Sequence, residues 1–215
     1  MKLLKIIFFY FIFTFCSVIS AATLSVTNIN HSLSKTQCDT TLTKKSKFFQ
    51  VIKKYNSHTN SRYQRYLATK KLHLKIYIKF LDKNIPSFFT LIPYNESGFN
   101  PKIKNSQAAG LWQFAISSGR NFGLVINKKK DERLDFNRST DAAIKYFKYL
   151  KKKYHKWYLV DFAYGMGEKR LDNLIAKHRS DEFLTLITDT NFPNGTKSHF
   201  IHTILLDAKI FPQKQ

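Results

Sequence analysis

Apolar side chains recur along most of the chain at the spacing of an α-helix, beginning near Leu42. The segment 157–166 is apolar nearly all round and is interrupted only by Asp161, which predicts a central, buried helix. Ser139 is expected to be the N-cap of an earlier helix. One-faced stripes in the helical segments comprise Tyr63, Leu67, Leu74, Ile78 and Leu81; Ala143, Phe147, Leu150 and Tyr154; Leu171, Leu174, Ile175 and His178; and Ile201, Ile204, Leu205 and Ala208. With no long strand and no internal repeat, the pattern predicts an all-α, mainly α-helical globule.

Proline and glycine mark the ends of a short helix in the middle of the chain. Pro86 suits the first turn of a helix that runs to about Ser97 and should be kinked at Pro93. Gly98 is expected to be its C-cap. Residues 100–113 then form a loop or a short hairpin.

The first 21 residues have the pattern of a secretory signal peptide. Lys2 and Lys5 precede an apolar run over residues 6–15, and small residues follow near position 20. The run is shorter than the roughly 20 residues that a transmembrane helix requires. The sequence therefore predicts export to the periplasm or cell envelope, with an uncleaved membrane anchor as the alternative.

The region that follows is rich in Ser, Thr and Asn. Residues 22–41 are accordingly expected to be a flexible spacer, and residues 42–212 to form one domain. Removal of residues 1–21 would leave Cys38 as the single cysteine, so no disulfide within the chain is expected.

Composition adds a strong positive charge. Hydrophobic residues make up 43% of the chain, enough for a substantial core, and the formal net charge is +22. Such a charge attracts polyanions, including nucleic acid, anionic lipid and acidic wall polymer. The excess is mostly lysine and no recognition motif accompanies it, so nucleic acid is not an expected partner. The histidines share no short spacing with carboxylates or thiols, and no metal or other cofactor is expected.

Glu96 is the candidate for catalysis. It stands at the end of an apolar helix, and nearby Phe88, Phe89 and Phe99 should remove water from its carboxyl group. The negative end of the helix dipole also disfavours a carboxylate. A carboxylic acid held in its neutral form can donate a proton to a glycosidic oxygen. A solvated surface glutamate is the simpler alternative.

Several motifs in order, at residues 96–101, 110–114 and 119–124, resemble the soluble-lytic-transglycosylase domain, glycoside hydrolase family 23. The resemblance covers about residues 80–180. It implies a goose-lysozyme-like helical fold with a glycan-binding cleft. It also implies cleavage of the β-1,4 bond between N-acetylmuramic acid and N-acetylglucosamine without water, leaving 1,6-anhydro ends.

In this family the residue that matches Glu96 is both acid and base. The resemblance implies that Gln113 and Tyr164 contact the substrate or orient the acid, and that Ser97 helps to position the end of the helix. Trp112 is either a sugar-stacking or a core residue. The implied partner is peptidoglycan, and the chain is expected to act as a monomer, with peripheral association with the envelope left open.

Two positions depart from the family pattern. Ala115 stands where methionine is usual, and Gly165 where asparagine is usual. Both changes leave Glu96 in place, but each could weaken binding of the glycan. Two alternatives to the lytic transglycosylase therefore stay open: a hydrolytic goose-type muramidase and a non-catalytic peptidoglycan-binding protein.

Overall fold

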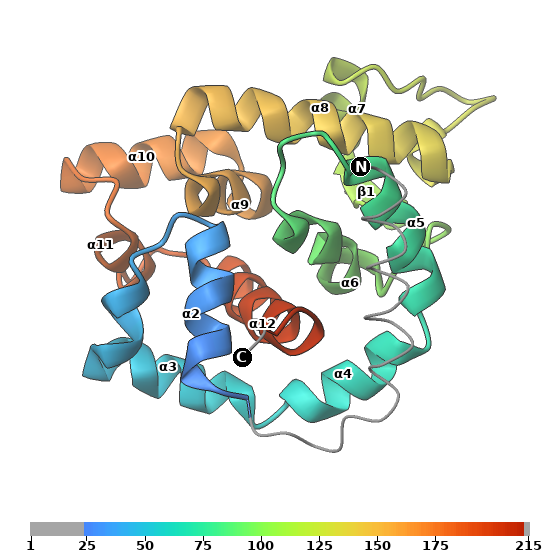
Figure 1. Ribbon diagram of the computed structural model, residues 1–215. Coiled ribbons are helices and arrows are strands. Elements are labelled where there is room, and N and C mark those ends of the chain that lie inside the picture. The colour runs from blue at the N-terminus through green and yellow to red at the C-terminus, as the bar shows by residue number, and fades with distance from the viewer. Residues whose placement is uncertain (1–23, 213–215) are drawn as a thin grey trace.

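The computed structural model describes residues 24–212 and is mainly α-helical, as predicted (Figure 1). The α-helices are α2 (Val26–Lys35), α3 (Ser46–Asn56), α4 (Thr59–Leu67), α5 (Lys70–Phe80), α6 (Ile92–Ser97), α7 (Ile116–Asn121), α8 (Phe136–Tyr154), α9 (Trp157–Met166), α10 (Glu168–His178), α11 (Phe183–Ile187) and α12 (Asn194–Ile210). Short 3-10 helices are η1 (Thr40–Lys44), η2 (Ser87–Leu91) and η3 (Glu132–Leu134), and a two-residue hairpin pairs β1 (Ala108–Ala109) with β2 (Phe114–Ala115). The predicted signal peptide, residues 1–21, lies outside the described residues.

Helix α12 occupies the centre of the molecule, where α2, α3, α4, α6, α9 and η2 pack around it (Figure 1). The predicted stripe of Ile201, Ile204, Leu205 and Ala208 is fully buried. Phe200, Leu206 and Ile210 on other faces are buried as well, so the helix is covered nearly all round. A helix in that position can bring its side chains into contact with several neighbouring elements at once.

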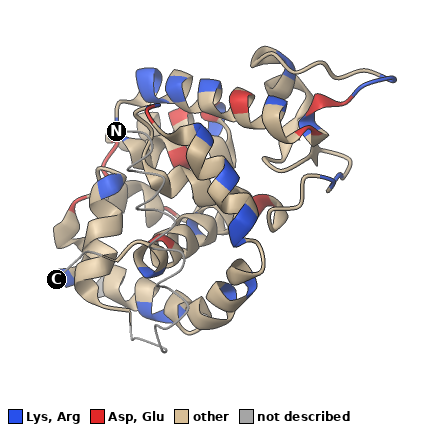
Figure 2. Ribbon diagram, turned by 45° about the vertical axis from the view of Figure 1, so that its right-hand side comes forward, with Lys and Arg blue, Asp and Glu red and all other residues tan. Residues whose placement is uncertain are grey.

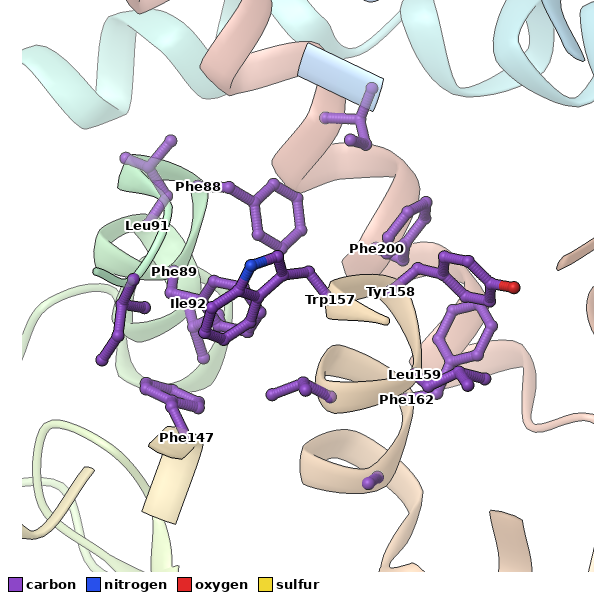
Figure 3. Packing of buried hydrophobic residues seen from close by; sticks show 14 of the residues in the cluster. Phe88, Phe89, Leu91, Ile92, Phe147, Trp157, Tyr158, Leu159, Phe162 and Phe200 are labelled. Atoms are coloured by element: carbon purple, nitrogen blue, oxygen red, sulfur yellow. The ribbon is translucent and has the colours of Figure 1, made fainter. Parts of the chain in front are cut away.

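Aromatic side chains form much of the core around α12 (Figure 3). The Phe89 ring from η2 lies between Phe147 of α8 and Trp157 of α9, with ring centroids 4.8 and 5.0 Å away. Phe162 of α9 packs edge-on against Phe200 of α12 at 5.3 Å. Helix α9 has the bounds and the deep burial that its apolar composition predicts. Large aromatic surfaces of this kind supply much of the hydrophobic stabilisation of a small domain.

The prediction of a flexible spacer over residues 22–41 is wrong for its described part. Residues 26–35 form α2, whose Ile29 and Leu33 are buried against α12. The Ser32 hydroxyl and the Lys35 ammonium each donate to the fully buried Asp207 carboxylate at 2.7 Å. Polar composition misled the prediction because polar side chains of this segment find a buried partner on a distant helix.

Replacing Leu33 with alanine should destabilise the whole domain, because α2 is part of its core. Removal of a fully buried leucine side chain should cost about 2–4 kcal/mol in the free energy of unfolding. The measurement is urea denaturation, with Val26→Ala as control because Val26 in the same helix is 48% exposed. Equal stability of the two variants would show that α2 is dispensable.

The stripe predicted over residues 63–81 is only partly right. The helix breaks between α4 and α5, which shifts the phase of the second helix. Helix α5 buries His73, Ile76 and Phe80, whereas Ile78 is 37% exposed. The buried His73 ring bonds to Tyr66 Oη at 2.6 Å and to Thr90 Oγ1 at 2.7 Å, and its burial lowers its pKa to about 3.

Two helix starts also differ from the prediction. The segment from Pro86 to Ser97 divides into η2 and α6, so Pro93 stands in the first turn of α6 and produces no kink inside a longer helix. Helix α8 begins before Ser139: Asp135 is its N-cap and accepts from Arg138 N at 2.8 Å. Gly98 is the C-cap of α6, as predicted, with φ 59°. In the described residues no helix has the length and apolar character needed to cross a membrane.

Candidate active site

Glu96 lies in the last turn of the short helix α6. The left-handed Gly98 ends this helix and lets the chain turn into the loop that carries β1 and β2. The predicted neighbours Phe88, Phe89 and Phe99 are buried in the core beneath. The Glu96 side chain remains 20% exposed, so part of it is accessible from solvent.

Helix α12 brings His199 to Glu96, with 3.4 Å between His199 Nδ1 and Glu96 Oε1. The hydrogen bond and the negative charge of Glu96 raise the pKa of His199, although its burial acts in the opposite direction. No sequence pattern predicts this pair, because the two residues are far apart in the chain and meet only through packing of α12.

Asp161 is a second carboxyl group beside this pair. It belongs to α9 and is only 7% exposed. Burial raises its pKa to about 7; the charge of His199 opposes this shift and that of Glu96 adds to it. The one charged residue of the apolar helix α9 therefore lies within electrostatic range of His199 and Glu96.

Tyr164 lies on α9 one turn further along. Its hydroxyl donates to the backbone carbonyl of Trp112 at 2.5 Å. Its pKa is raised well above the usual value, first by burial and then by the charge of Glu96. The Tyr164 hydroxyl thus fastens the Trp112 backbone to α9, within range of the charge of Glu96.

The Ser97 hydroxyl is buried between α6 and the following loop. Its oxygen lies 2.8 Å from the Leu111 carbonyl oxygen and 3.0 Å from that of Pro93. A hydroxyl has one proton, so it donates to either carbonyl in turn. These contacts hold the Glu96 end of α6 against the loop, which fits a positioning role.

Gln113 and Trp112 follow in that loop and differ in their surroundings. Gln113 has φ 47°, and its amide nitrogen donates to the Gly110 carbonyl at 2.7 Å. Trp112 is fully buried, stacks on Phe80 at 5.9 Å and donates from Nε1 to Thr140 Oγ1 at 3.1 Å. Of the two roles considered for Trp112, the structure selects the core residue.

The η3 segment fixes the far side of this loop. The Arg133 guanidinium donates to the Phe114 carbonyl at 3.1 Å and to both oxygens of Asp131, at 2.8 and 2.7 Å. Arg133 is 3% exposed. The buried Arg133 guanidinium therefore couples the hairpin strand β2 to η3 through charge-assisted hydrogen bonds.

Acid should weaken this coupling through Asp131. The hydrogen bonds from Arg133 lower the pKa of Asp131 to about 2, below its value of roughly 3.9 in an unfolded chain. The pair should therefore contribute up to about 2 kcal/mol above pH 4, which is lost as the pH falls from 4 to 2. In urea denaturation, Asp131→Asn should reduce the loss of stability between pH 7 and pH 2, whereas Asp141→Asn, at an exposed carboxylate, should not. The same acid sensitivity in both variants would contradict this assignment.

Gly165, one of the two departures from the family pattern, lies against α12. A Cβ atom at Gly165 would come within 3.2 Å of Thr196 Cγ2. Thr196 is buried, so its side chain fills the space beside the glycine. Within residues 24–212, no group of three or more His, Cys, Asp and Glu side chains is placed to hold a metal ion.

A helical core that presents one half-buried glutamate at the end of a short helix defines a lysozyme-like domain. Residues 81–187 match the family model of the transglycosylase SLT domain, and the chain belongs to this family. It is 34% identical over 119 residues to membrane-bound lytic murein transglycosylase D of Escherichia coli K12, covering 54% of this chain and 26% of that protein. It is also 34% identical over 91 residues to a putative tributyltin chloride resistance protein of Alteromonas sp. M-1, covering 41% of this chain and 44% of that protein. The chain thus spans less than half the length of either relative.

Proposed function

We propose that this protein is a lytic transglycosylase that cleaves the β-1,4 bond between N-acetylmuramic acid and N-acetylglucosamine in peptidoglycan. The observation that carries the proposal is the placement of Glu96 within the SLT domain, partly buried at the end of α6 and 3.4 Å from His199. The relative from Escherichia coli is named for the same substrate, murein.

In this mechanism Glu96 acts twice. It first donates a proton to the glycosidic oxygen as the bond from that oxygen to C1 of muramic acid breaks. The C6 hydroxyl of the same sugar then attacks C1 and gives its proton to Glu96, which restores the acid. The products are an N-acetylglucosamine hydroxyl end and a 1,6-anhydro ring, and no water is consumed. Because the nucleophile belongs to the substrate, one carboxyl group suffices, whereas ordinary glycosidases use two.

The other predicted site residues support Glu96. Ser97 fixes the end of α6 through the Leu111 carbonyl, and Tyr164 fixes the Trp112 backbone. Gln113, held in a left-handed conformation, is the loop residue proposed to contact the N-acetyl groups of the glycan. His199, whose Nδ1 lies 3.4 Å from Glu96 Oε1, is proposed to orient the Glu96 carboxyl group.

The site of action follows from the N-terminal pattern and the substrate. Residues 1–21 are proposed to direct export, so the protein meets peptidoglycan in the periplasm. It is proposed to act as a monomer without a cofactor, with its positive charge aiding association with anionic envelope polymers.

Product chemistry tests the proposal. Purified sacculi are digested with the protein and the soluble muropeptides are analysed by mass spectrometry, with Glu96→Gln protein as control. We expect 1,6-anhydromuramic ends from the unmodified protein alone. Reducing ends would instead establish a hydrolytic muramidase, and binding to sacculi without cleavage would establish a peptidoglycan-binding protein.

A further inference from the structure

A cavity of about 410 Å³ opens beside Glu96, between α4, α6 and α12. We call it the basic pocket; the residues that characterise it are Arg62, Arg65, Tyr94, Asn95, His199 and His202. It lies outside the catalytic contacts described above but shares His199 with them, and Asn95 precedes Glu96 in the chain. A group bound there would be close to the acid. Its volume lies within the range of small-ligand sites.

The basic pocket differs from the general positive charge of the protein. Lysines and arginines are spread over most of the helices (Figure 2), so charge alone marks no site. The residues that line this cavity include two arginines and two histidines, and none is acidic. Among the residues described, neither Arg62 nor Arg65 has a carboxylate within ion-pair distance, although other basic side chains do. Cations left unpaired around a cavity favour an anionic ligand.

Arg62 is held in place for such a ligand. Its Nη2 donates to Asn95 Oδ1, and its guanidinium lies 5.2 Å from the centre of the Tyr94 ring. The Tyr94 hydroxyl donates to the Arg62 carbonyl at 2.8 Å. Arg62 Nε is buried and has no hydrogen-bond partner, which is a costly state for a donor of a charged group. A fixed guanidinium with a free donor suits the planar geometry of a carboxylate.

The ionisable groups of the basic pocket repel one another. Burial lowers the pKa of Arg62, and the charge of Arg65 lowers it further. Burial, with the charges of Arg62, His199 and His58, lowers the pKa of His202 to about 4. His202 Nε2 is also buried without a partner. An anion in the cavity would relieve this repulsion.

We propose that the basic pocket binds a carboxylate of the peptidoglycan strand that is positioned at Glu96. This inference rests on the proposed function, because the strand supplies the anion. The carboxylate has two sources in this polymer: the acidic peptide attached to muramic acid, and the lactyl group that is free where the peptide has been removed. Either one would be drawn to Arg62 and Arg65 while the glycan lies beside Glu96.

The test measures binding by isothermal titration calorimetry. It uses the Glu96→Gln protein, which should not cleave its ligands because it lacks the proposed acid. The ligands are a peptidoglycan tetrasaccharide that carries its peptides, the same tetrasaccharide with free lactyl groups, and chitotetraose, which has no carboxylate. The substitutions Arg65→Gln and Arg62→Lys are each introduced separately into the Glu96→Gln protein. Lys71→Gln is the control, since Lys71 is exposed on the adjacent helix α5 outside the basic pocket and its loss changes the charge equally.

We expect Arg65→Gln to raise the Kd for a carboxylate-bearing ligand about tenfold, with little change for chitotetraose. An effect on the peptide-bearing ligand alone assigns the peptide as the source, and an effect on the ligand with free lactyl groups alone assigns the lactyl group. An equal effect on both muramic ligands means that the pocket accepts either carboxylate. An equal change for all three ligands, no change, or the same change with Lys71→Gln would overturn the inference. Cleavage of sacculi by the unmodified protein is a separate readout: binding with the expected pattern but without cleavage would overturn only the proposed function.

Discussion

Glu96→Gln is expected to lower the rate of glycan cleavage by about 10³-fold, because the variant loses both the acid and the base of the reaction. Glutamine has nearly the same shape, and the side chain it replaces is partly exposed, so the free energy of unfolding should change by less than about 1 kcal/mol. The measurement is the initial rate of release of muropeptides from solubilised strands, with urea denaturation in parallel.

The matched control for this variant is Glu168→Gln. Glu168 is a partly exposed glutamate at the start of α10, paired with Lys153, and lies in the same SLT domain. Its replacement should leave the cleavage rate within about twofold of the unmodified protein. A Glu96→Gln protein that keeps a tenth of the cleavage activity would contradict the assignment of Glu96. A Glu168→Gln protein that loses as much activity as Glu96→Gln would contradict it as well.

The Glu96→Gln variant should also change the NMR titration of the His199 ring. Since Glu96 raises the pKa of His199, its conversion to a neutral amide should lower that pKa. Titration of the His199 ring by NMR would detect the change without any substrate. An unchanged titration would mean that the two side chains do not interact in solution.

Hydrophobic periodicity predicted the helices that pack through apolar side chains. The nearly all-apolar segment of α9 and the stripes of α8 and α12 are buried as expected, because removal of apolar surface from water determines their position. In the stripe of α10 only Leu171 and Leu174 are buried, whereas Ile175 and His178 are partly exposed. The method failed at α2, where Ser32 and Lys35 pack through a polar partner, Asp207. It also misassigned the face of α5, since a break of two residues rotates every later position of a helix.

The candidate site was predictable where its residues are neighbours in sequence and not where packing assembles them. Glu96 and Ser97 lie in the motif at residues 96–101 and Gln113 in the motif at residues 110–114, whereas Tyr164 was predicted from the resemblance to the family. His199 and Asp161 carry no local pattern that links them to Glu96. Asp161 still carried a usable signal: a lone carboxylate in a buried apolar helix requires an electrostatic reason, and here it lies within electrostatic range of Glu96 and His199.

Gly110→Ala is expected to destabilise the loop beside Glu96 more than any other single methyl addition considered. Gly110 has φ +80°, and a Cβ atom there would lie 1.7 Å from the backbone oxygen of Arg133. The backbone of Arg133 is not free to move away from Gly110, because the Arg133 side chain is buried and hydrogen-bonded to Asp131. The cost should be at least about 4 kcal/mol in the free energy of unfolding, with loss of cleavage as the loop that carries Gln113 is displaced.

Gly195→Ala is the control for this prediction. Gly195 lies in the first turn of α12, and a Cβ atom there meets nothing within 4 Å. Alanine should be neutral or stabilising at this helical position, by up to about 1 kcal/mol. Urea denaturation and muropeptide release are compared for the two variants. If Gly110→Ala were as stable and as active as Gly195→Ala, the close approach of η3 to the loop would be wrong, and with it the account of how Gln113 is held beside the catalytic acid.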